Sequence, residues 1–394
     1  ETTANPSINK FTFMDTQAKY PVSADTQELK QVKGIIQKFL GPNFERFFAF
    51  YKDGTVRLHG NFNTVGARKT GRLSSSKPNL QNIPSKTILF QGTEHEVNLA
   101  TMCREIFIPD EGRMFVKLDY SGQENVLQAH FAVGENGKRI RAMYIENPRL
   151  DEHSYVTNVS GLGELYGDNV GRKYAKNLRF GKSYGMQLLS IMRNFGWDEE
   201  TAKEVENLVV TASPWVYETM DILQDMLKGE GQFRGRARPY IKTLAGRIIR
   251  MHNKNDAYKF YNYLIQGSAS DMIKAAMIKL WKTRTVDRLL LTVHDENCLD
   301  VSKDEEGFKR VDEMRIIMEN AIKLKIPIIC DPEVGSDWAH VEGQKKGEDK
   351  YPVETVIEMC RRVTKKKKIA ERNFDDVDEY VTSHYALDDE EEED

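Results

Sequence analysis

The sequence predicts an α+β fold in which a long helical segment is inserted between β-strands. An apolar run at Met114–Leu118 is typical of a buried strand, and Asp119 ends it. The middle of the chain, His153–Met251, reads mostly as helices separated by glycine-rich loops. Two further apolar runs in LLLTVHDENCLDV flank His294 and predict a hairpin with acidic residues at its tip.

Residues 1–70 are expected to combine a helix with a hairpin. The helix is predicted over Asp25–Leu40, with Ser23 or Asp25 as its cap. The stretch FAFYKDGTVRLHGNF predicts the hairpin because Asp53-Gly54 is a strong turn signal. The chain then turns polar at TGRLSSSKPNLQNIPS. Further along, a helix is expected over Asp256–Thr283.

The chain changes character after Trp338. Gln344–Lys350 reads as a polar linker, and VETVIEMCRRVTKKKKIAER as a basic amphipathic helix. Asn373–Asp394 carries eleven acidic residues and neither Lys nor Arg, so we expect it to be disordered. The net charge of −3 therefore conceals a basic body. Such a body suits a polyanionic partner, although mixed charge on a large protein is ordinary.

Composition places the chain among globular proteins. With 394 residues, of which 40% are hydrophobic, it can form two or three domains or subdomains around a sizeable core. No run of about 18 apolar residues occurs, and the first residues lack an apolar signal region, so we expect a soluble intracellular protein with no membrane partner. The four cysteines form no C-x-x-C pair, which favours reduced, buried thiols over a disulfide framework or a zinc ribbon.

One stretch, RKYAKNLRFGKSYGM, spaces two cations and two aromatic residues four apart: Arg172, Lys176, Phe180 and Tyr184. On an α-helix this spacing keeps the side chains on one face. A nucleotide, with a charged triphosphate and a flat base, would match such a face. A basic amphipathic surface helix packed on a core would show the same spacing, and the stretch alone favours that second interpretation.

Two carboxylates follow or interrupt apolar runs. Asp119 comes directly after the predicted strand, and Asp295 lies at the tip of the predicted hairpin. Rigid strand ends suit metal ligands, and two Mg²⁺ ions bound by carboxylates can activate an attacking oxygen and stabilise a leaving one in phosphoryl transfer. An isolated acid at a strand end is more often a solvated turn residue. It is the combination of the two that favours a metal site.

Five motifs together resemble the family A DNA polymerases of the bacterial polymerase I type, including phage-encoded members. TGRLSSSKPNLQNIP, KLDYSGQE, RKYAKNLRFGKSYG, LIQGSASD and VHDE occur in the family's order, and the similarity runs from about Asp53 to Trp338. The resemblance implies a right-hand fold with an antiparallel palm sheet and a helical fingers insertion. It predicts a thumb remnant at 1–70, palm at 71–135 and 251–340, fingers at 136–250, and an extension at 341–394.

The resemblance also implies the metal centre. Asp119, Asp295 and the backbone carbonyl of Tyr120 would hold two Mg²⁺ ions, with Mn²⁺ as a substitute, and Glu296 would assist within the metal shell. Lys176 would contribute to catalysis, because a lysine near the leaving pyrophosphate can donate a proton.

The incoming dNTP would be bound by the four-residue stripe. The resemblance places Arg172 and Lys176 on the phosphates, and Phe180 and Tyr184 against the sugar and base. Glu124 would close the space beside the sugar, so that a ribose 2′-OH would collide with it or leave it badly paired.

Primer-template DNA is the expected macromolecular partner. By resemblance, Arg72, Asn79, Gln81 and Asn82 would contact primer and template in the minor groove, where acceptors are shared by all correct pairs. Asn262 and Gln266 would lie on the template side. His294 matches a primer-terminus contact, although a histidine in a hairpin turn could equally be a capping residue.

Four departures from the family limit the transfer. Gly122 and Gln123 replace an amide and a buried apolar side chain of the family motif. Arg179 occupies a position where the family usually has Asn. Tyr258 occupies a position where the family usually has Arg, whose charge Lys259 could supply. Most of the thumb is missing before Thr70. The chain also begins with Glu1, so we expect a fragment, a processed product or half of a split polymerase, with a separate chain supplying thumb and exonuclease.

The leading hypothesis is a template-directed DNA polymerase that joins dNTPs to a primer 3′-OH and releases pyrophosphate. If a virus encodes the protein, it would act in the host cytoplasm. One alternative is a single-subunit RNA polymerase, against which Glu124 and TGRLSSSKPNLQNIP argue. Another is a non-catalytic nucleic-acid-binding subunit of a replication complex, against which the paired carboxylates argue.

Overall fold

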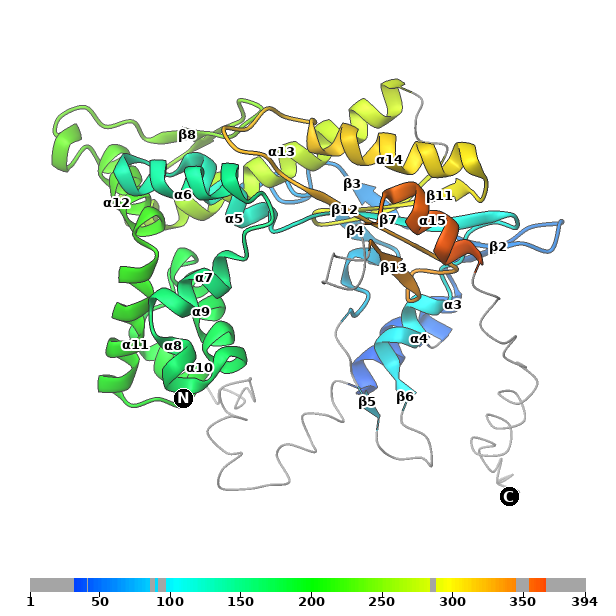
Figure 1. Ribbon diagram of the computed structural model, residues 1–394, viewed down its shortest axis with the longest axis horizontal. Coiled ribbons are helices and arrows are strands. Elements are labelled where there is room, and N and C mark those ends of the chain that lie inside the picture. Colours follow the sequence, from blue (N-terminus) through cyan, green and yellow to red (C-terminus); the bar gives the residue numbers. More distant parts are fainter. Residues whose placement is uncertain are drawn as a thin grey trace, which may run out of the picture.

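A five-stranded antiparallel sheet forms the centre of the molecule (Figure 1). The computed structural model describes residues 32–40, 42–85, 89–90, 97–283, 288–344 and 354–365. The order of strands across the sheet is β10-β11-β7-β12-β13. Their bounds are β7 Arg113–Tyr120, β10 Arg288–Val293, β11 Glu296–Ser302, β12 Cys330–Gly335 and β13 Val341–Gly343.

The central strand β7 is buried on both faces. Met114, Val116 and Leu118 belong to the larger of two hydrophobic cores, whereas Phe115 between them belongs to the smaller one. This division follows from the period of two in a strand, which sends successive side chains to opposite faces. The odd-numbered face also carries Asp119 at the end of the strand, so this carboxylate lies on the side of the smaller core.

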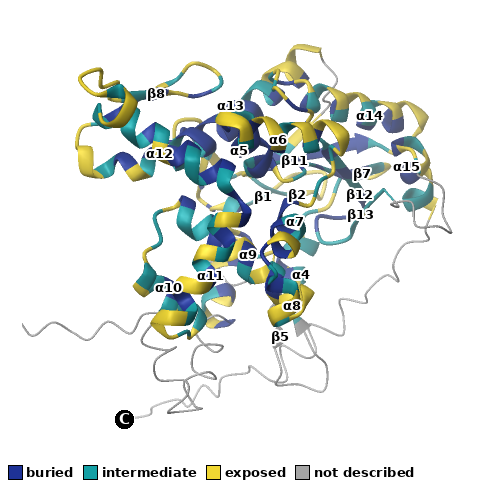
Figure 2. Ribbon diagram, turned by 60° about the vertical axis from the view of Figure 1, so that its left-hand side comes forward, coloured by how far each residue is buried: buried dark blue, intermediate teal, exposed yellow. Residues whose placement is uncertain are grey.

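Helices cover the larger core side of the sheet. The helices α13 (Phe260–Thr283), α14 (Glu305–Glu319) and α15 (Val356–Lys365) lie along it (Figure 1). α14 packs on β7, β11 and β12, and α15 packs on α14 and β12. Figure 2 shows buried residues concentrated where α13 and α5 meet. These helices cover one face of the sheet. The opposite face, which carries Asp119, is turned toward the rest of the chain.

The predicted helical insertion is present. Eight helices follow β7, and Figure 1 shows α7 to α11 as an arm that runs away from α5 and α12. The helices are α5 Gln123–Phe131, α6 Gly134–Glu146, α7 Glu152–Val159, α8 Leu162–Tyr166, α9 Asp168–Ser183, α10 Leu188–Phe195, α11 Glu199–Ala212 and α12 Pro214–Lys228. Asp151 caps α7 and Asp198 caps α11, each accepting hydrogen bonds from backbone amides of the first turn.

The remaining elements are short. They are η1 Ile36–Leu40, α3 Pro42–Glu45, β1 Phe48–Phe50, β2 Val56–Leu58, β3 Asn61–Asn63, β4 Ser74–Ser76, η2 Leu80–Asn82, β5 Leu89–Phe90, β6 Val97–Asn98, α4 Leu99–Glu105, η3 Gly231–Phe233, β8 Tyr240–Lys242, β9 Ile248–Arg250 and η4 Lys254–Lys259. Figure 1 shows α3 and α4 below the sheet, opposite α14. Leu80, Leu99 and Cys103 from these elements complete the smaller core with Phe115.

Most of the secondary structure predicted from the sequence is confirmed where the structure describes it, although the strand predicted to end before Asp119 continues to Tyr120. β1 and β2 form the hairpin around Asp53-Gly54, and β10 and β11 form the hairpin around His294. The helix expected over Asp256–Thr283 begins as the 3₁₀ turn η4 before it becomes α13. The first part of the helix expected over Asp25–Leu40, most of the polar linker and the acidic segment lie outside the described residues.

The basic helix α15 is docked on the body of the protein. Val356, Met359 and Cys360 are buried against it. Arg361 pairs with Glu305 of α14, and Arg362 donates to Glu354, to Glu342 and to the backbone carbonyl of Gly343. These two arginines are therefore occupied by intramolecular partners.

The cysteine prediction is confirmed, because all four cysteines are free and buried. Burial raises the pKa of Cys103 to about 11 and that of Cys360 to about 12, so these thiols are not ionised at neutral pH. Among the helices of the described ranges, none combines the length and the apolar character that crossing a membrane requires.

Trp338→Ala is expected to destabilise the protein by about 3–5 kcal/mol, the usual range for removing a large buried aromatic side chain. Trp338 is 1% exposed, stacks on Phe115 and meets Phe107 edge-on. Urea unfolding monitored by circular dichroism measures the change. Trp281→Ala is the matched control, because Trp281 is 77% exposed and its removal should change the free energy of unfolding by less than about 0.5 kcal/mol. Equal effects of the two changes would contradict the prediction.

Candidate functional site

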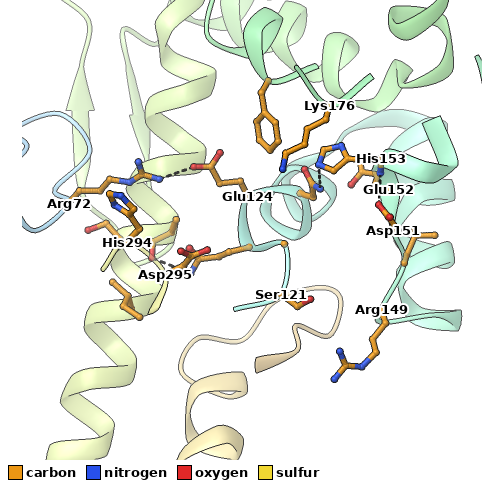
Figure 3. A pocket seen from close by; sticks show the side chains of 18 of the residues that line it. Arg72, Ser121, Glu124, Arg149, Asp151, Glu152, His153, Lys176, His294 and Asp295 are labelled. Atoms are coloured by element: carbon orange, nitrogen blue, oxygen red, sulfur yellow. Dashed lines mark hydrogen bonds and ion pairs between the residues drawn. The ribbon is translucent and has the colours of Figure 1, made fainter. Parts of the chain in front are cut away.

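A cavity of about 650 Å³ lies between the end of the central sheet and the helical arm. Figure 3 shows side chains from both parts pointing into it. Of the residues predicted from the sequence, eight line the cavity: Arg72, Gln81, Glu124, Arg172, Lys176, Phe180, His294 and Asp295. The fold therefore brings together residues from the polar loop, α5, α9 and the hairpin tip, up to about 220 positions apart in the chain.

Asp119 and Asp295 meet at one end of the sheet. β11 pairs with β7 so that Glu296 lies opposite Asp119, and the amide of Tyr120 donates to the backbone carbonyl of Asp295 at 3.4 Å. The turn that carries Asp295 has only two residues between β10 and β11, and His294 adopts a φ of 57° there. A left-handed residue suits a tight hairpin turn but is uncommon for a residue other than glycine. The turn thus holds His294 and Asp295 at the cavity.

The two carboxylates repel each other. Burial and the charge of Asp295 raise the pKa of Asp119 to about 8, and the neighbouring Glu296 adds to the shift. Burial also raises the pKa of Asp295, with a further contribution from Glu296 and Glu124. Lys117 acts in the opposite direction, because its positive charge stabilises the ionised Asp119 carboxylate. Its ammonium group pairs with Glu333 at 2.6 Å and lies 3.8 Å from Glu296. A bound cation would relieve this repulsion.

Asp119 and Asp295 fit a divalent metal site in which the substrate supplies some of the metal ligands. Two half-buried carboxylates with raised pKa values are the hard oxygen donors that Mg²⁺ prefers. Within the ranges that the structure describes, no group of three or more His, Cys, Asp or Glu side chains converges on a metal position. Mg²⁺ commonly binds through one or two carboxylates together with water and phosphate oxygens, so two carboxylates are sufficient.

Glu296 and Tyr120 have structural partners. The Glu296 carboxylate accepts from Trp338 Nε1 and from the Cys298 thiol, both at 3.0 Å. The Tyr120 side chain is buried and its hydroxyl donates to the backbone carbonyl of Met318 at 2.7 Å. The predicted metal role of Glu296 and of the Tyr120 carbonyl stays a prediction. The carboxylate of Glu296 already influences the site through its charge on Asp119.

The stretch with four-residue spacing is the helix α9, as expected. Arg172, Lys176 and Phe180 all line the cavity, while Tyr184 is the C-terminal cap of the helix. Arg172 is held by the capping residue of α7, since its guanidinium donates to both oxygens of Asp151. Lys176 points into the cavity beside Glu124 (Figure 3). The helix therefore presents cations and then an aromatic ring to the same space.

Glu124 is held by two side chains. Arg72 donates to its Oε1 at 2.7 Å, and the Tyr184 hydroxyl donates to its Oε2 at 3.2 Å. Gln266 of α13 in turn donates to the Tyr184 hydroxyl at 2.6 Å. This chain of hydrogen bonds joins the polar loop, α5, α9 and α13, and it fixes the Glu124 carboxylate at the cavity wall.

The other predicted DNA contacts belong to η2, to its cap and to α13. Gln81 donates to the backbone carbonyl of Thr292, next to the hairpin tip. Asn79 is exposed and caps η2, to which the exposed Asn82 also belongs. Asn262 is half-buried on α13, one turn before Gln266.

Two departures from the family pattern have a structural explanation. The amide of Gln123 is buried and lies 3.4 Å from the backbone carbonyl of Ala269 in α13, so this polar replacement has a partner. The ring of Tyr258 lies against Gly185, where a Cβ would approach it to 2.6 Å. Gly185 also has a φ of 84°, so glycine is required there for both reasons.

The sequence interpretation missed the start of α7. Arg149, Asp151, Glu152 and His153 line the cavity. The ring of His153 packs on Phe180, with 5.4 Å between the ring centroids. Burial and the nearby cations Arg179 and Lys176 lower the pKa of His153 to about 3, so it is neutral at physiological pH. The sequence did contain a signal for this helix start, namely the capping residue Asp151 followed closely by His153.

Comparison with protein families identifies the chain. A family model described as DNA polymerase family A matches residues 1–340. The chain belongs to DNA polymerase family A. It is 34% identical to the thermostable DNA polymerase I of Thermus filiformis over 298 residues, which cover 72% of this chain and 32% of that protein. A DNA-directed DNA polymerase of Pseudomonas phage M6 is 28% identical over 339 residues, 73% of this chain and 47% of that protein.

The chain spans about a third of the length of the DNA polymerase I relatives that it matches. Among solved structures, it is similar to the POL domain of Pol1 from M. smegmatis in complex with DNA primer-template and dNTP. The TM-score is 0.65 at 24% sequence identity, and the match covers 86% of this chain and 58% of that chain. This similarity confirms a mixed α+β fold like that of a polymerase domain.

Without metal, the contribution of Asp119 to stability is expected to fall as the pH rises from about 4 to 8, whereas the burial of His130 and His153 acts in the opposite direction. Unfolded Asp119 ionises near its ordinary pKa of 3.8, whereas the folded protein keeps the proton until about pH 8, so the fold loses about 1.4 kcal/mol per pKa unit over this window. Asp119→Asn removes this loss and should therefore raise the melting temperature at pH 8 in EDTA by several degrees.

Thermal unfolding of both forms at pH 5 and pH 8 measures the effect. Glu313→Gln, an exposed change on α14, is the control and should leave the pH dependence unaltered. Mg²⁺ should stabilise the wild type more than Asp119→Asn. A variant no more stable than the wild type at pH 8 in EDTA would contradict the interpretation.

Proposed function

We propose that this chain is a template-directed DNA polymerase, which adds dNTPs to the 3′-OH of a primer and releases pyrophosphate. The observation that carries the proposal is the cavity, in which Asp295, which repels the neighbouring Asp119, faces the cationic and aromatic side of α9. A negatively charged triphosphate and divalent cations would satisfy both sides at once. The family supports this activity, and the M. smegmatis complex provides a related fold bound to DNA and dNTP.

Asp119 and Asp295 would hold Mg²⁺ ions, or Mn²⁺ in their place, together with the Tyr120 carbonyl. The metal would supply charge stabilisation to the phosphoryl group and lower the pKa of the attacking hydroxyl. The role of the chain is then to position the reactants. Arg172 and Lys176 bind phosphate oxygens, and Lys176 can give a proton to the departing pyrophosphate. Since Arg172 is paired with Asp151, that aspartate orients its guanidinium.

Glu124 would discriminate against ribonucleotides. Its two oxygens accept from Arg72 and Tyr184, which leaves the carboxylate little freedom to move aside. A ribose 2′-OH next to it would either collide or separate Glu124 from these donors, and an unpaired buried charge is costly. Phe180, with its ring supported by His153, provides a flat apolar surface for the sugar.

The duplex would lie across the cavity mouth. Gln81, Asn79 and Asn82 on one side and Asn262 and Gln266 on the other are hydrogen-bonding side chains suited to minor-groove acceptors. His294, at the hairpin tip beside Asp295, would contact the primer terminus. In this proposal residues 71–135 and 251–340 form the palm, 136–250 the fingers, and 1–70 the base of a thumb. A separate chain supplying thumb and exonuclease stays a prediction.

Primer extension tests the activity. With Mg²⁺, dNTPs and a primed DNA template, the wild type should extend the primer, and Asp295→Ala should lower the rate by at least about 10³-fold because one of the two carboxylates is removed. Asp331→Ala is the control, since Asp331 lies beside Asp119 in the sheet but pairs with Arg149 outside the metal position. Extension that survives Asp295→Ala would attribute the activity to a contaminant or to other residues.

A second measurement tests the sugar contact of Phe180. Phe180→Tyr should increase incorporation of dideoxynucleotides relative to dNTPs by at least about tenfold, because the added hydroxyl can replace the missing 3′-OH interaction, worth about 1.4 kcal/mol or more. Competition between ddNTP and dNTP in primer extension gives the ratio. Phe195→Tyr on α10, outside the cavity, should leave the ratio at the wild-type value. An unchanged ratio for Phe180→Tyr would refute the contact.

A further inference from the structure

A buried ion pair joins α9 to α7 directly behind the cavity. Arg179 of α9 is 3% exposed, Glu152 at the start of α7 is 1% exposed, and Nη2 of Arg179 donates to Oε1 of Glu152. Two charges in a protein interior lose their hydration, and their attraction offsets this loss only in good geometry with further hydrogen bonds. The reaction proposed above uses neither charge.

The Glu152 carboxylate has two more donors. Trp215 Nε1 donates to Oε1 at 3.1 Å, and the Tyr144 hydroxyl donates to Oε2 at 2.8 Å. Trp215 belongs to α12 and Tyr144 to α6. The two oxygens of Glu152, at the start of α7, are therefore hydrogen-bonded to side chains of two other helices, α6 and α12.

The two terminal nitrogens of Arg179 are also engaged, whereas its Nε has no hydrogen-bond partner among the described residues. Besides Glu152, its Nη2 donates to Oε1 of Gln128 on α5 at 3.2 Å, and its Nη1 lies 3.4 Å from Nδ1 of His153. A guanidinium nitrogen can only donate, so this contact suits an unprotonated Nδ1, while the amide nitrogen of Asn125 lies 3.4 Å from Nε2 of the same ring. Arg179 and Asn125 thus face the two nitrogens of His153.

The pair is the middle one of three successive contacts between α7 and α9. Three consecutive residues at the start of α7 each contact a residue of α9. Two of these α9 residues, Arg172 and Phe180, are predicted nucleotide ligands, and Arg179 is not. The contacts are Asp151 with Arg172, Glu152 with Arg179, and His153 with Phe180. The outer two contacts line the cavity. In the middle contact Glu152 also borders the cavity, although it is only 1% exposed, and Arg179 lies behind it.

We propose that the ion pair between Arg179 and Glu152 is a positioning element of the nucleotide site. It sets the placement of α9 against α7, and so orients Lys176, Phe180 and His153 toward an incoming dNTP. The inference rests on the proposed function, since the site it positions is the dNTP site. A planar guanidinium fork with several acceptors specifies one arrangement of these helices, which a purely apolar contact would not do.

The test removes both charges while keeping the fold. In Glu152→Gln/Arg179→Met, the amide still accepts from Trp215, and Met fills most of the volume of the arginine side chain. Replacing a buried ion pair by uncharged groups is often neutral for stability. We expect a melting temperature close to that of the wild type, a KM for dNTP and a dissociation constant for mant-dATP that rise about tenfold, a kcat within about threefold, and unchanged affinity for primer-template DNA.

Lys182→Met is the matched control. Lys182 is on the same helix and pairs with Glu206 of α11, away from the cavity, so the KM and the mant-dATP affinity should not change. A double variant that keeps both its melting temperature and its mant-dATP affinity would show that the pair has no positioning role, as would an equal effect of Lys182→Met.

If the double variant does not fold, Arg179→Lys replaces it. Lysine keeps the charge but lacks the planar fork, and an unchanged mant-dATP affinity in this variant also overturns the proposal. The mant-dATP titration needs no turnover. A wild type that binds mant-dATP but does not extend primers would therefore refute the proposed function alone, whereas a wild type that binds no mant-dATP would refute both.

Discussion

The pairing of β11 with β7 is the interaction on which the site depends. Its register places Glu296 opposite Asp119 and brings Asp295 to the same end of the sheet. A slip by one residue would turn Asp119 toward the larger core, where Met114, Val116 and Leu118 now pack. The register that buries the apolar side chains of β7 is therefore also the one that brings the two repelling carboxylates together. Lys117, between Glu296 and Glu333, offsets part of the negative charge.

Local patterns in the sequence were sufficient to predict the elements that carry the site. The strand before Asp119, the hairpin around His294 and the helix with residues Arg172, Lys176 and Phe180 each follow from periodicity or turn chemistry within a short window. The proximity of Asp119 and Asp295 did not follow from such patterns, because strand pairing over more than 170 positions leaves no local trace. It was expected only through the resemblance of ordered motifs to a known family.

The rest of the site depends on burial, which residue type alone does not reveal. Glu152 and Arg179 look like surface charges in the sequence, yet both are enclosed by helices that come from distant segments. Gln123 likewise stands at an apolar position and is accommodated by the backbone of α13. Arg361 and Arg362 of the predicted basic helix are engaged by acidic residues of the same chain. Each outcome was decided by tertiary contacts.

The topology of the sheet has a consequence for the order in which the protein folds. β7 pairs only with strands that follow it by more than 150 residues, and the polar loop near Gly71 is held by Lys274 of α13. The arm formed by α7 to α11 consists of neighbouring helices with local contacts, which form quickly and need no segment after α12. During synthesis on the ribosome, α7 to α11 can fold while β7 waits for its partners, and the paired carboxylates assemble among the last features of the structure.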